Sequence, residues 1–237
     1  MTVEEIIKML DLKPHPEGGF FRETYRSSDS LAMDHLPNRY TLVSRPSRAG
    51  ARETLEWQVP PELEKQVEHV EHAGAIAARD ACDSVRPVRK SDMWSADDKT
   101  DPGDVSRAAS EDNERSFSTT IYYLLTPDSF SAMHRLKGDE VYHFYLGDPV
   151  EMLNLDSDGK STTVRLGHDI AGGALLQHVV ANGVWQGSRL VEGGKFALMG
   201  TTMSPGFSFA DYELGHRKSL MAEYTDCAAL IEKLTRA

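Results

Sequence analysis

Residues 134–149, HRLKGDEVYHFYLGDP, place two histidines, an acidic pair and three aromatic side chains in one short stretch. An imidazole and a carboxylate that converge inside a barrel can ligate a metal, act as an acid–base pair with mutually shifted pKa values, or only hydrogen-bond to each other. Side chains alternate in a strand, so one face is expected to carry His134, Leu136, Glu140, Tyr142 and Phe144, with His143 on the other.

Two further candidates for chemistry come from a neighbouring tyrosine pair and an early arginine. Tyr122 and Tyr123 alternate in a predicted strand, so one of them, taken as Tyr123, faces inward. Beside His134 an inward tyrosine would supply the second proton carrier that an epimerase requires. Arg22 could clamp a carboxylate or phosphate through two hydrogen bonds, or form a structural salt bridge.

Two later segments also carry candidates. Trp185 and Gln186 follow an Asn-Gly turn and could line the mouth of a pocket, although a tryptophan there can equally belong to the core or to a dimer contact. Asp211 and Glu213 share a face of a predicted strand, and one of them is expected to be an acid in a pocket or an interface.

The elements that must position these side chains are mostly strands. After residue 115 the chain contains short β-branched and aromatic runs, separated by Gly-Asp-Pro, Asp-Ser-Asp-Gly, Asn-Gly and Pro-Gly turns. Strands at this regular spacing are typical of an antiparallel sandwich or barrel. Amphipathic helices are predicted at residues 2–10 and 219–236, one at each end of the chain.

Residues 28–114 differ in composition from the sequence on either side. They are rich in Asp and Glu and contain too few large apolar side chains to offset the entropy lost on ordering so long a segment. We therefore expect residues 1–27 and 115–237 to form a single domain. The segment between them is expected to be a polar, partly disordered insertion with an exposed helix near residues 60–80.

Composition limits the kinds of partner. The 237-residue chain has a formal net charge of −11 and no basic stripe, which argues against nucleic acid and against an anionic membrane surface. Cys82 and Cys227 have neither CxxC nor Cys/His spacing, so no zinc knuckle or disulfide framework is expected. Without a secretory signal or a long apolar run at residues 1–10 or beyond, a soluble, cytoplasmic protein is predicted.

Four ordered blocks of the sequence resemble a known family. They are LKPHPEGGFFRETYRS (12–27), STTIYYLLTPDSFSAMHRLKGDEVYHFYLGDPVEM (118–152), GVWQGSRL (183–190) and TTMSPGFSFADYEL (201–214). Together they are similar to domain of unknown function 985 in the cupin superfamily, a jelly-roll group structurally similar to dTDP-sugar epimerases. The resemblance implies an all-β, cupin/RmlC-like jelly-roll β-sandwich with short terminal helices and a long polar insertion. It implies no established reaction.

The resemblance also suggests where a metal ion could bind. Metal-binding cupins use two histidines and a glutamate from a first motif and one histidine from a second. The matching positions here hold His134, Leu136, Glu140 and Gln186, so two of the four usual ligands are kept. His134, Glu140 and Gln186 with water could hold a divalent ion weakly, because carboxylate and amide oxygens suit Mg or Mn better than zinc. Alternatively, these residues are the polar lining of a small-molecule pocket.

The sequence leaves three functions open. The first is binding of a polar, sugar-like or acid-like small molecule inside the jelly roll, in a pocket lined by Arg22, Tyr142, Phe144, Trp185 and Gln186. The second is an enzyme, either a weakly metal-dependent cupin or a metal-free epimerase or isomerase, with catalytic groups on His134, Glu140 and Tyr123. The third is a non-catalytic scaffold or storage-like role. Pairing of edge strands, common in cupin-like barrels, predicts a homodimer.

Overall fold

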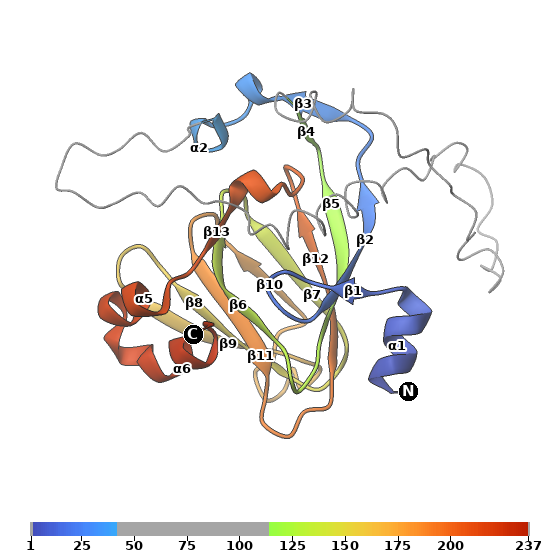
Figure 1. The fold of residues 1–237 in the computed structure, drawn as a ribbon, viewed down its shortest axis with the longest axis vertical. Helices are drawn as coiled ribbons and strands as arrows, with labels where there is room; N and C mark the ends of the chain where they lie inside the picture. The colour runs from blue at the N-terminus through green and yellow to red at the C-terminus, as the bar shows by residue number, and fades with distance from the viewer. Residues whose placement is uncertain (1, 42–113, 237) are drawn as a thin grey trace.

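The computed structural model describes residues 2–41 and 114–236. Within them the chain forms two antiparallel sheets that face each other (Figure 1). The first contains, in spatial order, β1 (Lys13–Pro14), β2 (Phe20–Arg26), β5 (Thr119–Leu125), β12 (Ala197–Met203), β7 (Glu140–Gly147) and β10 (Gln177–Val180). The second contains β13 (Tyr212–Leu214), β6 (Phe130–Leu136), β11 (Trp185–Leu190), β8 (Val150–Leu155) and β9 (Ser161–Leu166). The predicted all-β jelly-roll sandwich is confirmed.

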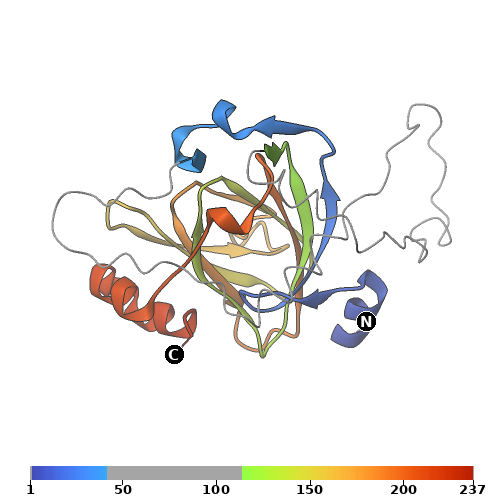
Figure 2. The same ribbon diagram turned by 45° about the horizontal axis from the view of Figure 1, so that its top comes forward.

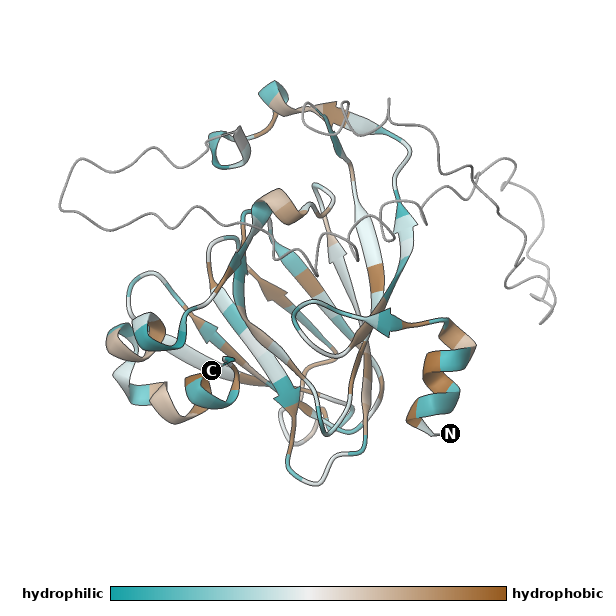
Figure 3. Cartoon of the chain, in the orientation of Figure 1, coloured by the Kyte–Doolittle hydropathy of each residue, from teal (hydrophilic) through white to brown (hydrophobic). Residues whose placement is uncertain are grey.

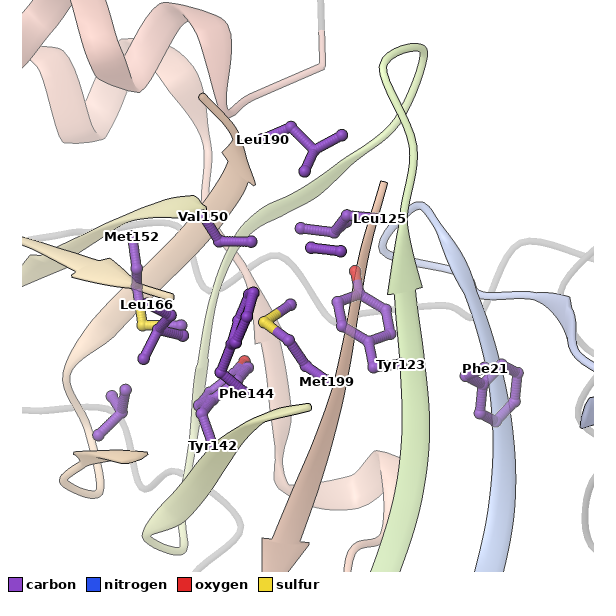
Figure 4. Packing of buried hydrophobic residues seen from close by; sticks show 12 residues of the cluster. Phe21, Tyr123, Leu125, Tyr142, Phe144, Val150, Met152, Leu166, Leu190 and Met199 are labelled. Atoms are coloured by element: carbon purple, nitrogen blue, oxygen red, sulfur yellow. The ribbon is translucent and has the colours of Figure 1, made fainter. Parts of the chain in front are cut away.

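Apolar side chains from both sheets fill much of the space between them. Because side chains alternate along each strand, every second residue of β5, β7 and β12 points inward. Tyr123, Phe144 and Met199 lie close together in this core (Figure 4), and Met152 and Leu166 reach it from the opposite sheet. The sheets are therefore held together mainly by burial of these side chains.

A helix covers the outer face of the first sheet. α1 (Val3–Leu10) is amphipathic, with hydrophilic and hydrophobic bands in Figure 3, and Ile6 packs against Leu124 of β5 and Leu198 of β12. The predicted helix near residues 2–10 is confirmed, including its capping box. The Thr2 hydroxyl accepts a hydrogen bond from the Glu5 amide at 3.2 Å, and the Glu5 carboxylate accepts one from the Thr2 amide at 2.8 Å.

The outer face of the second sheet is covered by the C-terminal segment, on the opposite side of the barrel from α1 (Figure 2). The single helix predicted over residues 219–236 is wrong. The segment forms α5 (Arg217–Glu223), a 3-10 turn η3 (Thr225–Cys227) and α6 (Ala228–Lys233). Tyr224 leaves the helical conformation at φ −119° and ψ 71°, and its hydroxyl donates a hydrogen bond to the Asp156 carbonyl at 2.8 Å. The break lets the side chains of both short helices pack on the same sheet.

A small β-pair lies beside one end of the barrel. It consists of β3 (Ser30–Ala32) and β4 (Glu114–Ser116), and β3 is followed by the 3-10 turn η1 (Met33–His35) and by α2 (Asn38–Thr41). Leu36 and Tyr40 are buried, so the first residues of the expected insertion pack against the rest of the protein. The predicted helix near residues 60–80 lies outside the described residues. In the two described ranges, no helix is long and apolar enough to span a membrane.

Candidate functional site

A band of polar side chains crosses the otherwise apolar space between the sheets. In the second sheet, Gln186 of β11 is the cross-strand partner of His134 of β6 and of Asn154 of β8. In the first sheet, Tyr142 of β7 is the partner of Thr201 of β12 and of His178 of β10. Cross-strand partners share a face, with Cβ atoms about 4.5–5.5 Å apart, so each set forms a row. We call these six residues and Glu140, two positions before Tyr142, the polar band.

Two hydrogen bonds of the polar band join the sheets. The Gln186 amide nitrogen donates to Glu140 Oε2 at 2.7 Å, and the Asn154 amide nitrogen and His178 Nε2 are 2.7 Å apart. The Tyr142 hydroxyl donates to the same Glu140 oxygen at 3.2 Å. Both carboxamides therefore direct their nitrogens at protein groups. Among the residues that the structure describes, three buried polar atoms here have no hydrogen-bond partner: Gln186 Oε1, Asn154 Oδ1 and Oγ of Ser188.

His134 presents an unprotonated nitrogen to Glu140. Its Nδ1 lies 2.7 Å from the Ala132 carbonyl oxygen, which can only accept a hydrogen bond, so Nδ1 carries the proton and Nε2 the lone pair. Nε2 is 4.0 Å from Glu140 Oε2, and the ring stacks on Tyr212 with centroids 5.4 Å apart. Burial lowers the pKa of His134, against the opposing charge of Glu140, and raises the pKa of Glu140. The arrangement can act as a base.

The turn before β2 brings a second carboxyl group to His134. Glu17 Oε2 is 3.5 Å from His134 Nδ1 and 3.4 Å from the Ser131 hydroxyl. Burial raises the pKa of Glu17 to about 8, which keeps this carboxyl group mostly protonated near neutral pH. Burial also lowers the pKa of neighbouring His15 to about 3, and His15 Nδ1 accepts a hydrogen bond from the Glu17 amide at 3.2 Å.

Glycine is required for the path of this turn. Gly18 has φ +119°, and a Cβ there would lie 2.0 Å from the Phe130 carbonyl oxygen. The Glu17 carbonyl accepts from the Ala132 amide at 3.0 Å, and the Tyr123 hydroxyl donates to the Gly18 carbonyl at 2.8 Å. Sequence reasoning missed His15 and Glu17. The available signal was a histidine and a glutamate inside a His-Pro-Glu-Gly-Gly turn directly before a strand.

A surface cleft of about 770 Å³ lies on the outer side of the same turn. His15, Glu17 and Gly18 form part of its wall, α1 contributes Val3 and Ile7, and further walls come from residues 126–130, Gly194, Lys195 and Arg236. Glu17 thus borders the cleft and also contacts His134 of the polar band. The turn separates solvent from the interior site.

The structure places the sequence candidates in two groups. His134, Glu140, Tyr142 and Gln186 lie together in the polar band, while Tyr123 and Phe144 lie in the adjoining core. Arg22 and Trp185 do not join them, which corrects the expected pocket lining.

Strand parity explains both exceptions. Phe21 faces the core, so Arg22 points to the outer face, where its guanidinium donates to the Leu10 carbonyl at 3.2 Å. Gln186 points inward, so Trp185 packs near the C-terminal helices with the Arg135 guanidinium 4.4 Å from its ring centroid.

The remaining candidates are engaged elsewhere. His143 stacks on Tyr145 with ring centroids 6.5 Å apart. Asp211 is buried and pairs with Arg115, with Nη1 and Oδ2 3.0 Å apart, while Glu213 forms an exposed pair with Arg135. Asp211 is therefore an interior structural acid.

The described residues fit a divalent ion poorly. No group of three or more His, Cys, Asp or Glu side chains in the two described ranges is placed to hold a metal. Glu140 Oε2 already accepts hydrogen bonds from Gln186 and Tyr142, and Gln186 turns its nitrogen, which cannot ligate a cation, toward this carboxylate. Of the three expected ligands, His134 Nε2 and Gln186 Oε1 remain unpaired among the described residues, which leaves two free ligand atoms beside a carboxylate oxygen that is already engaged.

Two facing sheets in jelly-roll order, with a polar band between them that includes a histidine and a glutamate, define a cupin-type protein. The chain matches the family model of the cupin superfamily (DUF985) over residues 4–56 and 86–215. The chain therefore belongs to this family, as the four sequence blocks predicted. The matched ranges extend into both ends of the segment that composition marked as an insertion.

Three relatives illustrate the family. An uncharacterized protein of Saccharomyces cerevisiae is 32% identical over 101 residues, which are 41% of this chain and 50% of that protein, so the match spans half the relative's length. A crystal structure of a protein from Shewanella oneidensis has a TM-score of 0.61 at 25% identity, covering 100% of this chain and 98% of that one. A hypothetical protein from Leishmania major has the same TM-score at 24% identity, with 100% of both chains covered. The two solved structures support the fold, and the reaction stays open.

Proposed function

We propose that this protein binds a small polar molecule between its two sheets, at the polar band. The observation that carries the proposal is the set of buried atoms without partners, Gln186 Oε1, Asn154 Oδ1 and Ser188 Oγ. A buried polar atom left unsatisfied costs about 1–3 kcal/mol, so an interior with three of them gains stability from an occupant that hydrogen-bonds to them. The surrounding aromatic side chains of Tyr142 and Phe144 would supply the apolar walls typical of a ligand site.

Thermal denaturation of the full chain tests this proposal. With sugars, sugar acids, keto acids and nucleotide sugars as probes, at least one probe should raise Tm, and the rise should grow with its concentration as mass action requires. Gln186→Met, which keeps the side-chain length and removes the amide, should reduce the rise, whereas the exposed Gln177→Met should not. Probes that leave Tm unchanged, or that act equally on both variants, would refute binding at the band.

Proton transfer is the second candidate, because His134 Nε2 is unprotonated and faces the interior. In an epimerase or isomerase, Nε2 would take a proton from a carbon beside a carbonyl group, and a second group would return a proton to the opposite face. Tyr123 is our proposed second group, since burial raises its pKa and keeps the proton on its hydroxyl.

Exchange of a ligand's carbon-bound hydrogen for solvent deuterium tests this candidate by NMR. His134→Gln should slow the exchange about 100-fold or more, the size expected when a general base is lost. Tyr123→Phe should slow proton return without removing ligand binding. Equal exchange in the wild type and in His134→Gln would restrict the protein to binding.

We also infer that two copies associate. β10 is an edge strand in the described part of the chain, and Val179 on it is 53% exposed, with Ile170 of the preceding loop 63% exposed. An apolar edge of this kind favours pairing with another chain. Light scattering should give twice the chain mass for the wild type and a smaller mass for Val179→Lys. A monomeric wild type at micromolar concentration would contradict the inference.

A further inference from the structure

We propose that the polar band selects a neutral, polyhydroxylated molecule, with Asn154 and Ser188 forming a second subsite beside the His134–Glu140 pair. This inference rests on the proposed binding function and names its ligand class. Neither Asn154 nor Ser188 belongs to the four residues that sequence reasoning brought to the band. Their placement follows from the pairing of β11 with β8.

The unpartnered atoms form a set that extends over two strands. Gln186 and Asn154 are direct cross-strand partners, and Ser188 is the next inward residue of β11, where its partner is Met152 of the core. Residues two apart in a strand are separated by about 6.6–6.8 Å. A single donor cannot reach all three atoms, so a ligand that satisfies them carries several hydrogen-bond donors at spacings of a few ångströms.

The atoms available to a ligand are mostly acceptors. The Gln186 and Asn154 nitrogens each use one N–H on Glu140 and on His178, their two carbonyl oxygens have no partner among the described residues, and the Ser188 hydroxyl can donate or accept. As the Asn154 amide is oriented, its nitrogen donates to His178 Nε2, which requires the neutral ring with its proton on Nδ1, and burial lowers the pKa of His178 and so favours a neutral ring. Hydroxyl groups of a ligand are donors and match such a site.

Charge separates a neutral ligand from an anion. The pKa of Glu140 is changed by the charges of His134 and Glu17, and the pKa of His134 is changed by the charge of Glu140. Among the described residues, the buried cation Arg115 is paired with Asp211, and Arg236, which acts on Glu17 and Tyr123, is exposed at the outer cleft and donates to the Pro16 carbonyl. A bound carboxylate or phosphate would thus meet a neutral imidazole and no unpaired buried cation of the described residues, so its desolvation would go largely uncompensated. Burial raises the pKa of both carboxyl groups, which also weakens the counter-charge that an ammonium ligand would need.

Ser188 offers a test that separates binding from folding. Its hydroxyl has no partner in residues 2–41 and 114–236, so Ser188→Ala removes a buried unsatisfied group and should not lower the stability of the ligand-free protein. The same substitution removes a contact to the proposed ligand. A serine with a structural role would give the opposite result, lower stability and unchanged affinity.

Isothermal titration of the full chain with glucose, rhamnose and myo-inositol, and with glucuronate, glucose 6-phosphate and glucosamine, tests the inference. We expect a neutral probe to bind at least tenfold more tightly than its charged counterparts. Ser188→Ala should weaken that binding about two- to tenfold with Tm unchanged or higher, and the exposed Ser157→Ala should not.

The possible failures are distinguishable. A charged probe that binds as tightly as the neutral ones, with loss in Gln186→Met, would overturn the ligand class and keep the binding function. Neutral binding that is insensitive to Ser188→Ala would overturn the second subsite. Probes that give no heat in the wild type, with the three atoms occupied by isolated waters in a crystal structure, would overturn both the inference and the binding function.

Discussion

Glu17→Gln should gain stability over the wild type as pH rises from about 5 to 8. The pKa of Glu17 is raised from 4.5 to about 8 by burial. At a pH below 4.5 both folded and unfolded chains hold the proton. Above it the unfolded chain releases the proton while the folded chain keeps it, so the free energy of unfolding falls by about 1.4 kcal/mol per pH unit until the folded pKa is passed. Glutamine cannot ionise, so Glu17→Gln avoids this fall in the free energy of unfolding, which amounts to about 3–5 kcal/mol over the whole pH range.

Urea denaturation of both proteins across this pH range measures the effect. Neighbouring His15 acts in the opposite sense, because burial lowers its pKa from the usual 6.5 to about 3, and its contribution to stability is lost as pH falls from about 6.5 toward 3. The difference in the free energy of unfolding between variant and wild type therefore isolates the effect of Glu17. The pH dependence of the wild type alone does not. Glu192→Gln, at an exposed position, is the control: it measures how the loss of a surface charge alone changes the free energy of unfolding. A difference for Glu17→Gln that does not change with pH would show that Glu17 is ionised in the folded protein.

Asp211→Ala should lower the free energy of unfolding by about 3–5 kcal/mol. Asp211 and Arg115 are 4% and 5% exposed, with Oδ2 and Nη1 3.0 Å apart, and Lys137 Nζ is 3.9 Å from Asp211 Oδ1. Removing the aspartate leaves a buried guanidinium without its counter-charge, which costs far more than the net contribution of the pair. The double variant Arg115→Met/Asp211→Leu should recover most of the loss.

The ion pair of Arg135 and Glu213 provides a matched control. It joins the neighbouring strands β6 and β13, and Glu213 is only two residues from Asp211, but its side chains are 40% and 54% exposed, so Glu213→Ala should cost less than about 1 kcal/mol. Guanidinium chloride denaturation of the variants gives the comparison. Equal losses for Asp211→Ala and Glu213→Ala would contradict the assignment of Asp211 as a buried structural partner.

The sequence predicted much of the fold because turn residues and alternating side chains act locally. Alternation across Gly138 correctly kept His134 of β6 and Glu140 of β7 on inward-facing positions. The break at Tyr224 was not predictable in the same way, since it depends on contacts of both short helices with the second sheet. The positions of Arg22 and Trp185 were predicted wrongly for a related reason. The hydrophobicity of a single strand did not decide which of its two alternating sets of side chains points between the sheets.

The missing members of the site depend on pairing between distant segments. Asn154 joins Gln186 only through the register of β8 with β11, and His178 joins Tyr142 only through the register of β10 with β7. Glu17 reaches His134 because its turn folds back over the end of β6. No local pattern encodes these meetings. They arise when distant strands pair within each sheet and the turn before β2 folds back over β6.

A crystal structure of the full chain as isolated, refined without assumptions about the interior, tests the central claim most directly. We expect density for a bound molecule larger than a single water, within hydrogen-bond distance of at least two of Gln186 Oε1, Asn154 Oδ1 and Ser188 Oγ. Protein side chains that satisfy these atoms, or isolated waters alone, would contradict it.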